Sequence, residues 1–463
     1  MVELRADYLD PSELSLLTSF PRRAGLPAIL TVRRRRDGGL WDGAEAERST
    51  LLARSVTGGF AFVDLEEDLE DPGLDRAVKR AGVRVIRSFH DFSGAPQGLG
   101  ERLRRLPRGP GEIPKAAVMP KSSEQLIRLA EALLQPGRGE KILVGMGEAA
   151  LFSRVLAAKM GCFLTYCSIV SDTAAAPGHL DPRTLVELYR FRRQNADTFV
   201  CGVIGDPIAH SRSPELHNRG YERLGLNGVY LPFLVDDVPA FFRLADLLEV
   251  RGFSVTMPHK RTVLPLLHDR DPAIERIGAC NTVVRRNQRW WGTNTDVQGF
   301  LSPLERTVPQ LVVPTTKATV IGAGGGARSV VHALCSRGIH PLIVNRSVAG
   351  ARALADLFDC SWAELGAAAV PRIRRHADLI VQATGAGMEP DSQADPLPQY
   401  GFSGSEVVYD LVYQPLLTVF RRRAQEAGCR TISGLDMLYA QGASQFEYFT
   451  GRKYPMELLD EIK

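Results

Sequence analysis

The sequence predicts an α/β protein in two parts, a β/α barrel followed by a region built on a second parallel sheet. Three observations lead to this expectation. Short apolar runs alternate with amphipathic stretches over residues 1–195, which is the pattern of parallel strands joined by helices. A new apolar strand starts at residue 199, after a polar connector. Residues 317–338 then combine a strand, a glycine-rich turn and a helix.

Composition and length limit the class of protein. At 463 residues the chain is too long for one ordinary hydrophobic core, and 44% apolar with 24% charged residues is typical of globular proteins. No run approaches the ~18 apolar residues of a membrane span, and the acidic start lacks the profile of a secretory signal. The seven cysteines are scattered without a CxxC pair. We therefore expect reduced thiols, a cytoplasmic location and no metal.

Two basic runs raise the question of nucleic-acid binding. They lie at 33–36 and 421–423, in a chain whose net charge is only +4. Without an accompanying nucleic-acid motif, each run is better explained as a solvated face or an anion-substrate site. We expect small-molecule substrates and no nucleic-acid or membrane partner, while the oligomeric state stays open.

The first part has seven strand candidates with helical patterns between them. They lie at residues 2–7, 28–33, 60–65, 83–89, 114–119, 141–146 and 162–168. A closed (β/α)8 barrel has eight strands, and the first candidate begins at the second residue. The expectation is a barrel over 1–195 that lacks its first strand–helix unit. Residues 183–199 read as its terminal helix and connector.

The second part contains a dinucleotide-binding pattern. Gly322-x-Gly324-x-x-Ala327 follows a strand and opens a helix, so the turn is tight and a pyrophosphate can approach the backbone. The next strand ends in Asn345 and Arg346, where a guanidinium can pair with a 2′-phosphate. The sequence therefore predicts a Rossmann domain that binds NADP. The simpler readings are a plain strand–helix turn and a surface arginine.

Polar residues precede this domain at expected strand ends. Ser211 and Ser213 lie two residues apart and can hold a carboxylate, although Ser213 fits equally well as a helix cap. Lys260 and Asp296 can pass a proton to and from a hydroxyl while a hydride moves to or from nicotinamide. A solvated lysine is the alternative for Lys260.

Taken together, residues 199–463 resemble shikimate dehydrogenase. The shared segments are HSRSP, SVTMPHK, ACNTV, NTDVQGF, IGAGGGAR, VNRS, QATGAGM, YDLVYQP and SGLDMLYAQGASQFEYFTG. The resemblance implies a substrate domain at 199–305, completed by 435–463, and a Rossmann domain at 306–434. It makes Lys260 the catalytic acid/base with Asp296 beside it. It also implies substrate contacts from Ser211, Ser213, Thr256, Asn281, Asp296, Tyr413 and Gln441, and NADP contacts from Gly322, Gly324, Gly325, Asn345, Arg346 and Gly434. Gln382 replaces the usual asparagine of the family.

The barrel has polar residues of its own at strand ends. Lys115 lies inside an apolar strand, where burial lowers the pKa of an amine and lets it form a Schiff base with a ketone. His90 can move the proton beside that imine. Arg33 and Arg154 offer forked donors to a carboxylate. From composition alone, these residues have equally good structural explanations. His90 fits the edge of a core, Lys115 fits a lysine whose stem is buried and whose charge reaches water, and the arginines fit a solvated surface.

This set resembles type I 3-dehydroquinate dehydratase over most of residues 1–182. The shared segments are ELRAD, TVRRRRDGG, VDLE, SFHDF, IPKAAVMP, VGMG with SR, and AAPGH. The resemblance makes Lys115 the imine-forming lysine and His90 the general acid/base. It assigns substrate contacts to Glu3, Arg5, Arg33, Arg154 and His179. The chain departs from the family at Ala175 and His179, which replace a serine and a glutamine, and in the absent first strand–helix unit.

The order of the two parts resembles the fused dehydratase–dehydrogenase of the shikimate pathway. The product of the first reaction, 3-dehydroshikimate, is the substrate of the second. We expect two active sites that convert 3-dehydroquinate to shikimate with NADPH. The alternatives are a shikimate or quinate dehydrogenase with an inactive barrel, and a sensor that binds such ligands without turnover.

Overall fold

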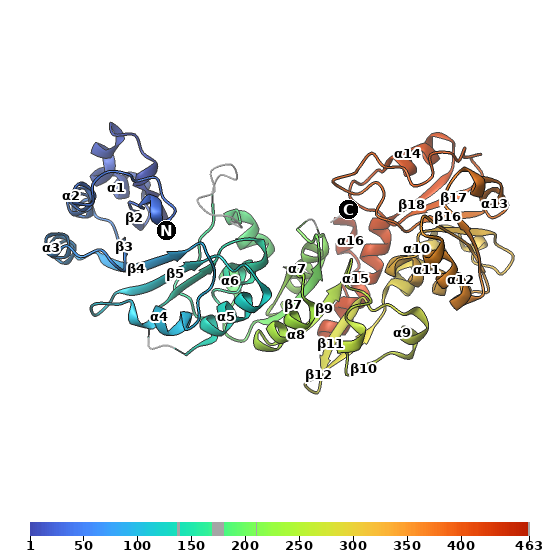
Figure 1. The fold of residues 1–463 in the computed structure, drawn as a ribbon, viewed down its shortest axis with the longest axis horizontal. Helices are drawn as coiled ribbons and strands as arrows, with labels where there is room; N and C mark the ends of the chain where they lie inside the picture. The colour runs from blue at the N-terminus through green and yellow to red at the C-terminus, as the bar shows by residue number, and fades with distance from the viewer. Residues whose placement is uncertain (137–138, 169–179, 210, 462–463) are drawn as a thin grey trace. The chain divides into compact units, whose positions relative to one another are not determined.

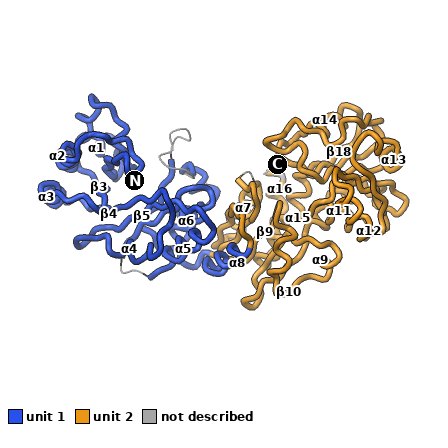
Figure 2. The backbone as a smooth tube through the Cα atoms, viewed as in Figure 1, with its two compact units in different colours: residues 1–198, 239–249 blue, residues 199–238, 250–463 orange. Residues whose placement is uncertain are grey.

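The computed structural model describes residues 1–136, 139–168, 180–209 and 211–461 (Figure 1). The chain divides into two compact units, coloured separately in Figure 2. Unit 1 comprises Met1–Thr198 together with Pro239–Glu249, and unit 2 comprises Phe199–Val238 together with Val250–Lys463. Among the described residues, no helix is both long and apolar enough to cross a bilayer.

Unit 1 is built on a parallel sheet of six strands in sequential order. The strands are β1 (Val2–Arg5), β2 (Ala28–Thr31), β3 (Phe62–Glu66), β4 (Arg84–Asp91), β5 (Ile113–Val118) and β6 (Ile142–Gly145). Its helices are α1 (Phe20–Ala24), α2 (Glu45–Ser55), α3 (Pro72–Ala81), α4 (Leu99–Arg105), α5 (Ser123–Leu134), α6 (Phe152–Val155) and α8 (Val238–Leu247). The central strands β2, β3 and β5 are buried along their whole length, as expected when both faces of a parallel sheet are covered.

The prediction of a seventh strand at 162–168 is wrong. The Phe163 amide donates to the Lys141 carbonyl at 2.8 Å, but no strand forms there. Phe163, Leu164 and Tyr166 instead pack against the apolar residues of the sheet, so the segment contributes side chains to the core without a hydrogen-bond ladder. In place of the predicted terminal helix at 183–199, the chain forms a π-helix at Thr184–Leu188 and a 3-10 helix at Phe191–Arg193.

Unit 2 contains two sheets. The first has the order β10-β12-β11-β9-β7-β8 and mixes parallel with antiparallel pairs. Its strands are β7 (Phe199–Gly205), β8 (Gly228–Leu234), β9 (Val250–Val255), β10 (Asp269–Arg270), β11 (Thr282–Arg286) and β12 (Arg289–Thr293). Helices α7 (Ser213–Arg223), α9 (Pro272–Ile277), α15 (Gly434–Thr450) and α16 (Leu458–Glu461) accompany it. Phe446 and Phe449 of α15 share a core with Cys201 and Val203 of β7, so the end of the chain completes this layer.

The second sheet is parallel and has the order β15-β14-β13-β16-β17-β18. This is the doubly wound Rossmann order, in which the order of the strands reverses between β13 and β16, while all strands stay parallel. The strands are β13 (Ala318–Ile321), β14 (Leu342–Asn345), β15 (Ser361–Glu364), β16 (Leu379–Gln382), β17 (Val407–Asp410) and β18 (Arg430–Ser433). The helices are α10 (Asp296–Thr307), α11 (Gly325–Cys335), α12 (Val348–Phe358), α13 (Val370–Arg374) and α14 (Val419–Glu426).

Candidate active sites

Strand alternation places the polar residues of unit 1 on the inner face of its sheet. One face of the sheet, called the inner face here, carries a cluster of buried apolar side chains: Ile29, Phe62, Ile86, Ile113, Ile142 and Val144. Ile86 and Ile113 lie near the start of β4 and β5. Since side chains alternate with a period of two, His90 of β4 and Lys115 of β5 lie on the same face further along. The inner face is therefore apolar at one end and ionisable at the other.

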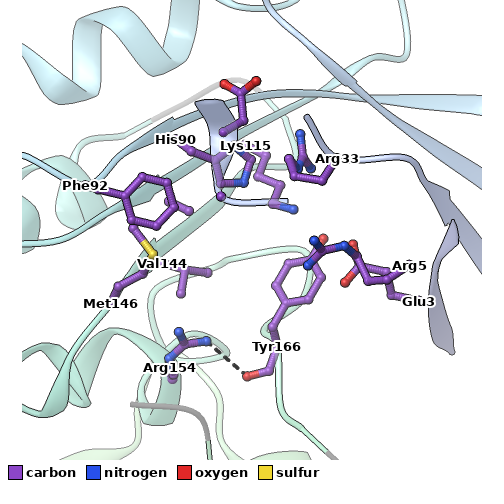
Figure 3. Close-up of a pocket in the computed structure, with 13 residues that line it drawn as sticks. Glu3, Arg5, Arg33, His90, Phe92, Lys115, Val144, Met146, Arg154 and Tyr166 are labelled. Carbon is purple, nitrogen blue, oxygen red and sulfur yellow. Dashed lines mark hydrogen bonds between the residues drawn. The ribbon is translucent and has the colours of Figure 1, made fainter. Parts of the chain in front are cut away.

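A pocket gathers these residues (Figure 3). Its lining includes six of the predicted site residues: Glu3, Arg5, Arg33, His90, Lys115 and Arg154. His179 and Ala175 lie outside the described residues. The lining also includes residues that the sequence analysis did not single out: Asp37, Phe92, Met146 and Tyr166.

Lys115 is buried, with 5% of its surface exposed, and makes an ion pair. Its Nζ lies 2.7 Å from Oδ2 of Asp64, a fully enclosed carboxylate that the sequence analysis also missed. The same Nζ lies 4.3 Å from the centre of the Tyr166 ring. Burial alone would raise the pKa of Asp64, but the charges of Arg33 and Lys115 outweigh burial and hold that pKa well below its ordinary value.

Arg33 is fully engaged within the protein. Its two terminal nitrogens lie 2.7 Å from Asp64 and 2.6 Å from Glu66, and it also donates to the Ser88 hydroxyl at 3.1 Å. Ser88 in turn donates to Asp64 at 2.5 Å. Arg33 therefore fixes the carboxylate beside Lys115 and has little capacity left for a ligand.

Arg154 is the arginine whose donors face the pocket. It is almost fully buried, and Nη1 donates to the Tyr166 carbonyl at 3.2 Å, as the dashed line in Figure 3 shows. The buried Nε has no hydrogen-bond partner among the described residues. Burial lowers the pKa of Arg154 to about 10, because the loss of hydration outweighs the opposing effect of Cys167. This guanidinium is suited to a carboxylate ligand.

His90 is held neutral. Burial, followed by the charges of Arg33 and Lys115, keeps the pKa of His90 well below its ordinary value. Its Nδ1 is enclosed and has no hydrogen-bond partner among the described residues. A neutral imidazole beside a lysine can accept a proton. At the pocket wall, Glu3 accepts from the Thr31 hydroxyl at 2.8 Å, and Arg5 pairs with Asp7 at 2.7 Å.

The predicted Lys260–Asp296 pair is present in unit 2. Lys260 Nζ lies 2.5 Å from Oδ2 of Asp296, the first residue of α10. The Asn281 amide donates to Oδ1 of Asp296 at 2.7 Å and to Oε1 of Gln441 at 3.2 Å. The structure therefore joins four of the predicted site residues in one contact network. They come from the loop after β9, the residue before β11, the start of α10 and helix α15.

The remaining predicted substrate contacts are distributed around this unit. The Ser213 amide donates to the Ser211 hydroxyl at 3.3 Å, and Ser213 begins α7. Burial raises the pKa of Tyr413, while the charge of Arg212 and a hydrogen bond with Ser211 oppose the rise. This hydrogen bond places Tyr413 beside Ser211. Thr256 packs closely against Gly205. A Cβ added to Gly205 would lie only 2.5 Å from the methyl group of Thr256.

The glycine turn after β13 fits a dinucleotide. Gly322 has φ +117°, a region that L side chains rarely adopt, and a Cβ there would lie 2.9 Å from the Ala383 carbonyl. Gly324 caps α11 and has open space around it, so a pyrophosphate can reach the helix N-terminus. A Cβ on Gly325 would lie 3.1 Å from the Lys260 side chain. The turn and the candidate catalytic lysine are therefore neighbours.

The other predicted cofactor residues lie at the ends of the Rossmann strands. Asn345 ends β14 and its amide donates to the Ser347 carbonyl at 3.1 Å, while Arg346 is exposed. A Cβ on Gly434 would lie 2.2 Å from the Leu411 carbonyl, so this position requires glycine. Gln382 organises the turn after β16, since it accepts from the Thr384 amide at 2.8 Å and donates to the Ala386 carbonyl at 3.0 Å.

Family models match both units. The type I 3-dehydroquinase model matches residues 1–196. The shikimate dehydrogenase substrate binding domain matches 203–283, the shikimate/quinate 5-dehydrogenase model matches 306–390, and the shikimate 5′-dehydrogenase C-terminal domain matches 434–457. The dehydratase-type barrel and the Rossmann dehydrogenase that the sequence predicted are thereby confirmed.

Individual relatives agree with the models. A bifunctional 3-dehydroquinate dehydratase/shikimate dehydrogenase, chloroplastic, of Arabidopsis thaliana is 31% identical over 483 residues, which cover all of this chain and 79% of the relative. A shikimate dehydrogenase (NADP(+)) of Moorella thermoacetica is 41% identical and covers 58% of this chain and 93% of its own length. NADP is the cofactor that these relatives support.

Solved structures match the dehydrogenase part. Shikimate 5-dehydrogenase from Thermus thermophilus in complex with NADP(H) and shikimate has a TM-score of 0.51 at 36% identity, covering 57% of this chain and 98% of that one. Quinate dehydrogenase from Corynebacterium glutamicum in complex with NAD has a TM-score of 0.52 at 28% identity, covering 57% and 98%. Because the similarity to the Arabidopsis protein spans both units, the chain belongs to the family of bifunctional 3-dehydroquinate dehydratase/shikimate dehydrogenases.

Proposed function

We propose that unit 1 dehydrates 3-dehydroquinate to 3-dehydroshikimate through Lys115 and His90, and that unit 2 reduces this product to shikimate with NADPH through Lys260 and Asp296. One observation carries the first assignment: a buried lysine, a neutral histidine and an uncompensated arginine line one pocket. The second rests on the Lys260–Asp296 pair beside the glycine turn. The fused order supports the scheme, since the first product is the second substrate.

In the dehydratase site, Arg154 holds the substrate carboxylate. Lys115 Nζ, once it has lost a proton, adds to the ketone carbon, and water leaves as the imine forms. The imine acidifies the neighbouring C–H, and His90 accepts that proton. His90 then returns the proton to the departing hydroxide as the carbon–carbon double bond forms. Hydrolysis of the imine releases the product and restores Lys115.

The wall residues of the pocket have supporting roles. Glu3 and Arg5 face the substrate hydroxyls, and Arg33 acts by fixing Asp64 against Lys115 rather than by holding the carboxylate. His179 stays a proposed substrate contact from the sequence. This division replaces the sequence-based expectation that Arg33 and Arg154 together bind the carboxylate, because the donors of Arg33 are already taken.

In the dehydrogenase site, Lys260 donates a proton to the substrate oxygen, and Asp296 orients its ammonium group. When bound, NADPH supplies the hydride that the reduction requires. Asn281 holds Asp296, and Gln441 accepts from the Asn281 amide. Both face the substrate hydroxyls together with Thr256. Ser211, Ser213 and Tyr413 hold the substrate carboxylate. Residues 199–305 with 435–463 thus form the substrate domain of this unit.

Residues 306–434 form the NADP domain. Gly322, Gly324 and Gly325 receive the pyrophosphate at the start of α11, and Gly434 provides close backbone approach. Asn345 and Arg346 receive the adenosine end, where the guanidinium pairs with the 2′-phosphate.

A cytoplasmic location and the absence of a nucleic-acid partner belong to the same proposal. None of the seven cysteines is paired in a disulfide, which fits a reducing compartment. The net charge of +4 is too mild for a nucleic-acid surface.

Trapping and variants test the proposal together. Borohydride added with 3-dehydroquinate should reduce the imine and leave a stable adduct on the peptide that contains Lys115. The Lys115→Ala variant should form no adduct, lose dehydration and keep reduction of 3-dehydroshikimate, while Lys260→Ala should show the converse. Loss of both activities in either variant, or an adduct elsewhere, would contradict the two-site assignment.

A further inference from the structure

Two cysteines and a histidine, distant in sequence, meet on the Rossmann domain. Cys335 ends α11, His340 lies in the loop before β14, and Cys360 lies between α12 and β15. The Sγ atoms of Cys335 and Cys360 are 3.7 Å apart. One ligand atom from each of the three residues lies within 4.8 Å of the others. The scattered cysteine spacing in the sequence predicted no metal, but the fold assembles a ligand set.

The end of α12 holds these side chains in place. The Phe358 carbonyl accepts from Cys360 Sγ at 3.5 Å and from Cys335 Sγ at 3.9 Å. Nδ1 of His340 lies 3.1 Å from the Asp359 carbonyl, an outer contact of the kind that orients metal-binding imidazoles. Asp359 has φ +53° and terminates the helix, which turns both carbonyls toward the cluster.

The sulfur separation suits a tetrahedral ion. Two thiolates that each lie about 2.3 Å from a tetrahedral zinc ion are about 3.8 Å apart, close to the 3.7 Å observed. A disulfide requires an S–S distance of about 2.05 Å, and it would not account for the imidazole beside the two sulfurs. The cysteines are half-buried and His340 is exposed, so an ion can enter from solvent.

We propose that Cys335, His340 and Cys360 bind one Zn²⁺ ion, with water as the fourth ligand. The ion ties the end of α11 to β15, the edge strand of the sheet. Helix α11 has 11 residues and spans about 16 Å, so this site lies at the opposite end of the helix from the glycine turn. Its role is to stabilise the Rossmann domain, and it is independent of the two proposed reactions.

Cobalt titration of the full chain tests the site. The reduced, chelator-treated protein should bind one Co²⁺ per chain with a thiolate-to-cobalt charge-transfer band, and Zn²⁺ should displace it. Cys335→Ser and Cys360→Ser should each abolish the band, and His340→Ala should weaken binding at least about tenfold. Cys429→Ser is the matched control, because Cys429 is a buried thiol of the same domain outside the cluster, and it should bind like the parent.

Stability provides a second readout. Added Zn²⁺ should raise the Tm of the parent and of Cys429→Ser but not of Cys335→Ser. Shikimate dehydrogenase activity of His340→Ala should be unchanged, so that failure of this site is distinguishable from failure of the proposed reactions. The proposal is overturned by a band that survives both cysteine variants or by an absent band. Conversion of the pair to a disulfide in air, without metal uptake by the reduced protein, would also overturn it.

Discussion

The ammonium of Lys115 lies 2.7 Å from Oδ2 of Asp64, and the guanidinium of Arg33 lies 2.7 Å from Oδ1 of the same carboxylate. All three side chains are almost completely enclosed. One anion thus compensates two buried cations, with Glu66 as the second partner of Arg33. This network sets the position of the lysine that we propose as the nucleophile.

Asp64→Asn should therefore impair both stability and dehydration. Removing the anion leaves Lys115 without a counter-charge in a buried site, a change that costs about 3–5 kcal/mol. We expect a lower urea midpoint for unit 1 and loss of dehydration, with 3-dehydroshikimate reduction retained. Asp42→Asn is the control, since Asp42 pairs with Arg35 at the surface and its loss should cost about 0–1 kcal/mol. Equal stability of the two variants would argue against the network.

Arg154→Lys should separate binding from folding. Lysine keeps the charge but loses the fork that holds a carboxylate at two points, so KM for 3-dehydroquinate should rise about 10-fold to 100-fold. The urea midpoint should stay close to that of the parent. Arg105→Lys, at an exposed surface position, is the matched control. An unchanged KM would show that another residue holds the carboxylate.

Arg346→Ala should change cofactor preference. Without the guanidinium the 2′-phosphate loses its partner, and KM for NADPH should rise about 10-fold to 100-fold while KM for NADH stays unchanged. Arg352→Ala removes an exposed arginine from the following helix and should affect neither constant. Parallel increases for both cofactors in Arg346→Ala would mean that Arg346 does not recognise the phosphate.

His217 should make unit 2 sensitive to acid. The ring is fully buried, stacked at 4.1 Å on Tyr230, and burial lowers the pKa of His217 to about 3, whereas the unfolded chain has the ordinary value near 6.5. The unfolded state binds the proton more readily than the folded state. The contribution of neutral His217 to the free energy of unfolding is therefore fully present above about pH 6.5 and is lost as pH falls toward 3. Between pH 7.5 and 5 the loss is about 2 kcal/mol.

Urea unfolding of unit 2 at those two pH values measures this effect. In His217→Phe, which keeps an aromatic ring but cannot be protonated, the pH-dependent loss should shrink by that amount. The same loss in the parent and in His217→Phe would assign the acid sensitivity to other groups.

Much of the fold followed from local patterns, because apolar runs and glycine turns are properties of short segments. The glycine turn at 322–327 with the helix that follows it and the strand that carries Lys115 are examples. The strand predicted at 162–168 does not form. An apolar pattern shows that a segment is buried, but it does not show whether a neighbouring strand has free backbone groups for hydrogen bonds.

Contacts between distant segments were beyond the sequence. Asp64 meets Lys115 across an intervening strand, and Cys335 meets Cys360 only after α12 has folded back. The competition of Asp64 and Glu66 for the donors of Arg33 likewise requires three-dimensional geometry. Residue types at strand ends identified the candidate chemistry, whereas the structure distinguished a residue that binds ligand from one that positions another residue.

The most direct test of two working sites in one chain is a product assay by NMR. Purified protein is given 3-dehydroquinate with NADPH and, separately, 3-dehydroshikimate with NADPH. Shikimate should form from both substrates, with 3-dehydroshikimate as a transient in the first reaction. Shikimate from 3-dehydroshikimate alone would contradict the account, because the pocket around Lys115 would then be inactive and the chain would be a dehydrogenase only.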